Sequence, residues 1–163
     1  MVFLAFTAAM LMRRDGSPDW VGMHKPPILW LNTTLLLLSS LALERARRML
    51  RTGDRARFNR WWTVGTGLGV LFLAGQWTAW QQLSAAGLYL GSSNLSASFF
   101  YILTASHAAH LIGGLAALLY VEVGALRLRL GPSKRTFIDV SAVFWHFLDV
   151  LWIYLMVLFY VFG

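Results

Sequence analysis

Two ionisable residues, His146 and Asp149, lie inside the apolar stretch FWHFLDVLWIYLMVLFY near the carboxyl end of the chain. A charge within the hydrocarbon of a bilayer costs about a few kcal/mol or more unless it is paired or hydrated, so both residues are functional candidates. Their three-residue spacing puts the two side chains on one face of a helix. In the preceding apolar segment, His107 and His110 share a helical face in the same way.

These residues could support a metal site, a haem site or a proton path. Two histidines three apart lack the third ligand and the supporting partners that a catalytic zinc site needs. A haem could be ligated by His107 or His110 together with His146, because haem can be held between facing helices of a bundle. Proton transfer is the third chemistry, along Asp139, His146 and Asp149, which follow one face of a helix.

A structural role is the plainest interpretation of the same residues. Polar groups in hydrocarbon must satisfy one another, and facing helices can do this through mutual hydrogen bonds. We therefore expect a polar network between the last two apolar segments, joined by a buried amide on the third segment. Its expected members are His107, His110, His146, Asp149 and Gln76. Asp139 and Glu122, near the inner ends of their segments, are the candidates for collecting protons at the membrane surface.

The composition of the chain places these residues in a membrane. Hydrophobic residues make up 58% of the 163 residues and charged residues only 13%, against about 25% charge in an ordinary soluble domain. There is no cysteine, which excludes disulfides, thiolate metal sites and thiol redox chemistry. The net charge of +7 lies in short runs between apolar spans, so it indicates membrane topology and not binding of nucleic acid.

The apolar residues fall into five segments, which predict an all-α fold. We expect residues 1–163 to form one transmembrane domain, a bundle of five helices at about 1–12, 26–44, 61–81, 97–126 and 137–162. The first segment is too short to cross a bilayer, since about 12 residues cover about 18 Å of a core about 30 Å thick. We expect this helix to be incomplete, with the natural helix beginning before Met1.

The charged loops orient the expected bundle. Seven arginines and two acids lie between the second and third segments, and four basic residues lie between the fourth and fifth. By the positive-inside rule both loops are cytoplasmic, which puts the N-terminus inside and the C-terminus outside. The first of these loops could also contact anionic lipid headgroups. The residues expected to do so are Arg57, Arg60, Trp61 and Trp62.

Two long stretches of the chain resemble a known family. SFFYILTASHAAHLIGG and FWHFLDVLWIYLMVLFYVFG are similar to the last two helices of subunit III of the haem-copper oxidases, the family of cytochrome c oxidase, in its prokaryotic five-helix form. The matching positions are Phe99, Phe100, His107, His110, Trp145, His146, Phe147, Asp149 and Trp152. LFLAGQ places Gln76 at the family's glutamine, and Asp139 stands where the family usually has a glutamate. The acid that many members carry shortly after that glutamine is absent.

The resemblance implies a non-catalytic subunit of an aerobic respiratory terminal oxidase in a prokaryotic cell (inner) membrane. It implies that oxygen reduction and its haem and copper cofactors belong to subunits I and II, and that this chain holds no cofactor, metal or catalytic residue. The implied partners are subunit I as the main contact, subunit II, a small subunit IV and membrane phospholipid. The implied roles are assembly, lipid binding and support of proton uptake and pumping by subunit I.

Other identities stay open on the sequence alone. Within the family, the parent complex could be a quinol oxidase, or the chain could be the companion of a nitric oxide reductase. Outside the family, the chain could be a small b-type membrane cytochrome that uses His107 or His110 with His146. A stand-alone proton channel fits less well, because the histidines and acids form one stripe and not a pore through the bundle.

Overall fold

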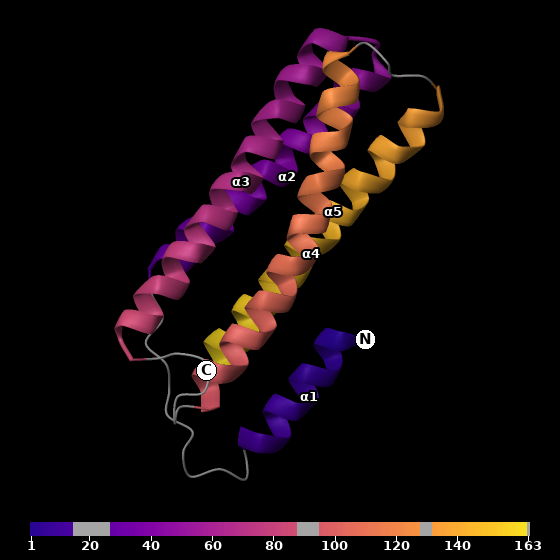
Figure 1. Ribbon diagram of the computed structural model, residues 1–163. Coiled ribbons are helices and arrows are strands. Elements are labelled where there is room, and N and C mark those ends of the chain that lie inside the picture. The colour runs from indigo at the N-terminus through magenta and orange to yellow at the C-terminus, as the bar shows by residue number, and fades with distance from the viewer. Residues whose placement is uncertain (15–26, 88–94, 128–131, 163) are drawn as a thin grey trace.

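The computed structural model describes residues 1–14, 27–87, 95–127 and 132–162. Within them the chain forms five α-helices, α1 (Val2–Arg14), α2 (Ile28–Arg51), α3 (Arg55–Ala85), α4 (Leu95–Leu126) and α5 (Pro132–Phe162). Figure 1 shows α2 to α5 as long helices and the short α1 apart from α2 and α3. α1 instead packs against α4. The predicted all-α class with five helices is confirmed for these residues.

The five helices differ in their apolar character. Two of them, α4 and α5, contain stretches long and apolar enough to cross a membrane, Ala97–Leu126 and Lys134–Val161. α2 and α3 continue beyond the apolar segments at about 26–44 and 61–81 into arginine-rich sequence, because arginine and alanine favour helix as strongly as many apolar residues. At about 1.5 Å per residue, α2 is about 36 Å long and α3 about 46 Å.

A tight turn connects α2 to α3 and sends α3 back along α2 (Figure 1). Gly53 has a positive φ of 82°, which glycine adopts without steric cost, and its amide donates to the Leu50 carbonyl at 3.2 Å. Asp54 begins α3 as its N-cap, since its carboxylate accepts a hydrogen bond from the Arg57 amide at 3.0 Å. The turn therefore fixes which faces of the two helices meet.

Small residues on α3 let α2 approach closely. The Ser39 hydroxyl on α2 donates to the backbone carbonyl of Gly65 at 2.7 Å. A Cβ built on Gly75 would lie only 2.1 Å from the amide oxygen of Asn32. Packing at this distance requires glycine on α3, as is common where membrane helices are in contact.

Tryptophans hold the other helices in register. Trp62 is fully buried, and its indole N–H donates to the Leu118 carbonyl at 3.1 Å, which joins α3 to α4. The indole N–H of Trp152 on α5 donates to the Thr33 hydroxyl on α2 at 3.0 Å. The Trp152 ring also lies edge-on to Phe72 of α3, with centroids 5.0 Å apart. These contacts set the position of the polar side chains of α5 relative to α2.

Candidate functional site

A polar cluster lies where α5 packs against α2. Nδ1 of His146 on α5 shares a hydrogen bond with the hydroxyl of Ser40, and Nε2 of the same ring lies 3.6 Å from Oε2 of Glu44. The Asp149 carboxylate, about one turn further along α5, lies 3.8 Å from His146 Nδ1. The spacing of His146 and Asp149 therefore brings both to one face, as expected for residues three apart, and this face meets α2.

Arg47 extends the cluster toward the turn between α2 and α3. Its guanidinium lies 3.0 Å from Oε2 of Glu44 and 2.9 Å from Oδ1 of Asp139. One arginine thus joins an acid on its own helix to an acid on α5. Because Glu44 also faces His146, a continuous set of polar side chains runs from Asp139 to Asp149. We call this set the α2–α5 cluster; its members are Ser40, Glu44, Arg47, Asp139, His146 and Asp149.

The α2–α5 cluster passes from the surface of the chain into its interior. The side chain of Asp139 is 50% exposed, that of His146 is 32% exposed and that of Asp149 is 5% exposed. Ion pairs and hydrogen bonds between two helices tie the helices together. Neighbouring carboxylates and imidazoles are also the groups from which proton relays inside membranes are built. The arrangement can therefore hold α5 on α2 and can exchange protons at its exposed end.

The two histidines of α4 have different neighbours. His107 is buried, and its ring centroid lies 5.2 Å from that of Trp152. His110 is exposed; its Nδ1 lies 2.7 Å from the Ser106 carbonyl oxygen, and its ring lies 5.7 Å from that of Phe3 on α1. Neither ring is hydrogen-bonded to the α2–α5 cluster in the described parts of the chain. The shared spacing of the two histidines thus does not bring them to one partner.

The remaining polar candidates are Gln76, which is buried on α3, and Glu122, which lies where α4 contacts α3. Gln76 is buried on α3, and its amide forms no hydrogen bond with any described residue. Glu122 on α4 accepts a hydrogen bond from the Thr63 hydroxyl of α3. Glu122 and Asp139 therefore lie at different helix interfaces, and only Asp139 belongs to the α2–α5 cluster.

The residues expected at lipid headgroups also divide into two groups. Trp62 is fully buried between α3 and α4. The other three, Arg57, Arg60 and Trp61, line a hollow beside the turn between α2 and α3. Burial of Trp62 follows from its neighbour: successive residues of a helix point about 100° apart, so adjacent tryptophans cannot both face the surface hollow.

Three members of the α2–α5 cluster were not expected from the sequence. Ser40 falls within an apolar run, and Glu44 and Arg47 count among the charges of a loop if the helix is ended at its last apolar residue. Their spacing carries the missing signal, since residues 40, 44 and 47 share a face once α2 continues to Arg51.

A metal site would need several of the described histidines and acids to lie close together. No group of three or more His, Asp or Glu side chains in the described residues is placed to hold a metal ion. His146 is engaged by Ser40 and faces Glu44, while His107 packs against Trp152. These two histidines take part in hydrogen bonding and aromatic packing in the structure.

The fold and the site define an all-helical membrane protein whose ionisable side chains join helices to one another. Comparison with known proteins gives the family: the family described as cytochrome c oxidase subunit III matches residues 14–163. The chain belongs to the cytochrome c oxidase subunit III family and is a subunit of a cytochrome c oxidase complex. The resemblance noted from the sequence is confirmed.

Bacterial relatives agree with this assignment. The cytochrome c oxidase subunit 3 of Synechocystis sp. is 32% identical over 166 residues, which cover 98% of this chain and 69% of the relative. The protein of the same name from Corynebacterium diphtheriae is 32% identical over 148 residues, covering 89% of this chain and 72% of the relative. That of Thermostichus vulcanus is 27% identical over 168 residues, covering 99% and 80%.

Proposed function

We propose that this chain is the non-catalytic subunit III of an aerobic oxidase that takes electrons from cytochrome c in a prokaryotic membrane. Subunits I and II would carry the haem and copper, reduce oxygen and pump protons, with subunit I as the main contact of this chain. The α2–α5 cluster is the observation that carries the proposal of a non-catalytic role, because its ionisable side chains make contacts between helices. The relatives' names favour cytochrome c over quinol as the donor.

We propose further that residues 1–163 form one domain in which all five helices lie in the membrane. The support on α2 is that polar residues are buried while the outer face is apolar: Asn32 and Ser39 are at 0% exposure, and Leu37 and Leu41 are 43% and 63% exposed, although other leucines of the helix are buried. A helix in water buries its leucines and exposes its polar residues. α3 repeats the pattern, with Thr66 buried and Val64, Val70 and Leu71 exposed. Apolar outer faces of this kind suit contact with lipid.

The arginine-rich turn between α2 and α3 would then face the cytoplasm, with the C-terminus on the outer side, in accord with the positive-inside rule. The exposed end of the α2–α5 cluster, at Asp139, lies on the same side as this turn, since Asp139 pairs with Arg47. Asp139 would collect protons at the inner surface, with Glu122 as a second collector on α4. Arg57 and Arg60 would contact phospholipid headgroups there.

Purification of the intact complex through a tag on this chain tests the proposed function. We expect haem- and copper-containing subunits I and II to co-purify, and the complex to consume oxygen with reduced cytochrome c. Oxidation of quinol in the absence of cytochrome c would contradict the proposed donor. A haem band in the isolated subunit that disappears in His146→Ala would contradict the non-catalytic role and favour a b-type cytochrome.

A further inference from the structure

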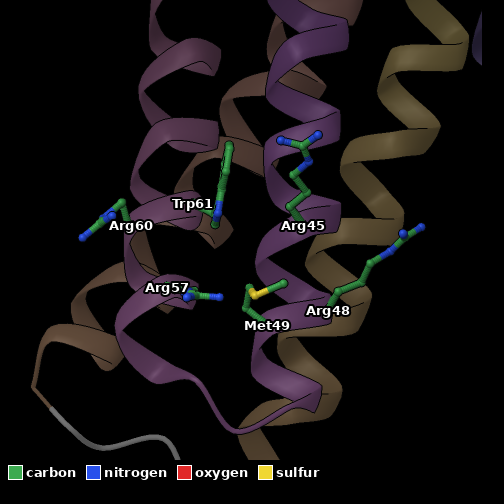
Figure 2. Close-up of a pocket in the computed structure, with 6 residues that line it drawn as sticks. All are labelled: Arg45, Arg48, Met49, Arg57, Arg60 and Trp61. Carbon is green, nitrogen blue, oxygen red and sulfur yellow. The ribbon is translucent and has the colours of Figure 1, made fainter.

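A hollow of about 510 Å³ lies beside the turn that connects α2 to α3 (Figure 2). Its volume falls within the range of about 300 to 1,000 Å³ that is usual for small-molecule sites. Two helices contribute equally to it, and each uses residues at positions i, i+3 and i+4, which share a helical face. The lining residues are Arg45, Arg48 and Met49 from α2, and Arg57, Arg60 and Trp61 from α3.

The four arginines of the hollow retain positive charge that the protein does not neutralise. Nε of Arg57 lies 3.2 Å from Asp54, and Nε of Arg48 lies 3.5 Å from Glu44, so each acid engages only one edge of a guanidinium. Arg60 has no hydrogen-bond or ion-pair partner among the described residues. Glu44 is moreover shared with other basic groups of the α2–α5 cluster. The rim of the hollow therefore favours an anion.

The inner part of the hollow is apolar. Figure 2 shows Arg57 reaching from α3 toward Met49 on α2, while Arg48 and Arg60 extend away on the two sides. The guanidinium of Arg45 lies 5.1 Å from the ring centroid of Trp61, a cation–π contact that keeps both side chains at the site. An apolar floor of methionine and tryptophan beneath a cationic rim suits a ligand with one anionic end and one apolar end.

We propose that this hollow binds the phosphate of an anionic phospholipid. The phosphate lies between the guanidiniums of Arg45 and Arg57, which can each donate two parallel hydrogen bonds to it, and the glycerol and upper acyl carbons lie over Met49 and Trp61. A soluble phosphate compound without an apolar part would gain no binding energy from contact with Met49 and Trp61. The proposal rests on the membrane position of α2 and α3 given above, and it adds Arg45 and Arg48, which the sequence did not single out.

Two matched double variants test the site in the purified oxidase complex. Arg45→Gln with Arg57→Gln removes two charges from the hollow. Arg51→Gln with Arg55→Gln removes two charges from the same segment but from outside the hollow, since Arg51 lines a different crevice with Asp139 and Arg55 is exposed. The complex is delipidated in detergent and titrated with phosphatidylglycerol or phosphatidylcholine, and bound lipid is counted by native mass spectrometry.

We expect the first variant to weaken phosphatidylglycerol binding about tenfold or more and the second to change it less than about threefold, with phosphatidylcholine binding unchanged in both. Arg45→Lys with Arg57→Lys keeps the charge but loses the planar fork, so it should weaken binding to an intermediate degree even if the glutamine variant assembles poorly.

Equal losses in the two glutamine variants would overturn the proposal, because they would show attraction by overall charge and not by a site. Unchanged binding in the first variant would also overturn it. Displacement of the lipid by millimolar inorganic phosphate would assign the hollow to a soluble anion instead. The subunit content of each preparation is a separate measurement: loss of subunits I and II from the wild-type complex would contradict the proposed function, whatever the lipid count.

Discussion

Replacement of Asp149 by alanine removes the most deeply buried acid of the α2–α5 cluster. Its side chain is 5% exposed, and its ion-pair contact among the described residues is with His146, 3.8 Å away. With His146 protonated and Asp149 ionised, the two charges would attract at that distance by about 4 kcal/mol at an effective dielectric constant of about 20. The desolvation of both groups offsets much of this attraction. We therefore expect Asp149→Ala to lower the stability of the chain by about 1 to 3 kcal/mol.

The structure predicts that removal of His146 costs more than removal of Asp149. In Asp149→Ala, His146 keeps its hydrogen bond to Ser40 and its contact with Glu44 at 3.6 Å. In His146→Ala, the buried Asp149 carboxylate loses its ion-pair contact and keeps only the nearby Ser40 hydroxyl, and removal of one partner of a buried ion pair costs about 3 to 5 kcal/mol. Asp149→Asn preserves the shape and hydrogen-bonding capacity of the side chain, so its stability should lie between those of the wild type and Asp149→Ala.

Thermal dissociation of this chain from the purified complex measures the ranking, together with the fraction of the chain that co-purifies with subunits I and II. Val150→Ala is the matched control, because Val150 follows Asp149 on α5 but is 66% exposed, and surface changes of this kind alter stability within about 0.5 kcal/mol. The reasoning fails if Asp149→Ala behaves like this control, or if Asp149→Ala is more damaging than His146→Ala.

Two further substitutions probe the ends of the helix contacts. Asp139→Ala should slow proton uptake while leaving assembly normal, because the Asp139 side chain is half-exposed, so that its ion pair contributes about 1 kcal/mol or less, and Arg47 keeps Glu44 as a partner. Identical turnover of the vesicle-reconstituted complex at high pH would argue against a role of Asp139 in collecting protons. Gly75→Ala should destabilise the complex by about 1 to 3 kcal/mol, since the new Cβ meets Asn32 at 2.1 Å. Asn32→Ala in the same chain should restore part of the thermal stability, and no recovery would contradict the steric explanation.

The helices were predictable because their apolar segments are long and contain few charges. The ends of the helices were harder to predict. Apolar residues indicate which part of a helix suits a bilayer, whereas the hydrogen-bonded backbone of the helix can continue into polar sequence. α2 continues from the last apolar residues through ERARRMLR to Arg51, in a sequence of good helix formers, and stops at Gly53 with its positive φ. The mean hydropathy of α2 and α3 is lower than that of α4 and α5, because α2 and α3 contain buried polar side chains and terminal arginines.

The face of a helix can be predicted from spacing, but the neighbour of that face cannot. The spacing of His146 and Asp149 put them on one side of α5, and we expected His107 and His110 of α4 to lie opposite. The structure places α2 there instead, and His146 contacts Ser40. Helix pairing depends on close packing at particular positions, such as Gly65 and Gly75 against α2, and a single sequence does not reveal which helix those glycines meet.

Glu44 makes the interhelical contact and the arginine-lined hollow parts of one electrostatic unit. Its carboxylate lies 3.0 Å from Arg47 and 3.6 Å from His146 on the side of α5, and 3.5 Å from Arg48 on the rim of the hollow. Arg47 and His146 each have a second acid, Asp139 and Asp149 respectively, whereas Arg48 has only its share of the Glu44 charge among the described residues. The arginines of the hollow therefore keep the capacity to bind an anion at the surface, while α5 keeps a charged partner in the interior. α2 contributes to both sites because its adjacent residues Arg47 and Arg48 point about 100° apart around the helix axis.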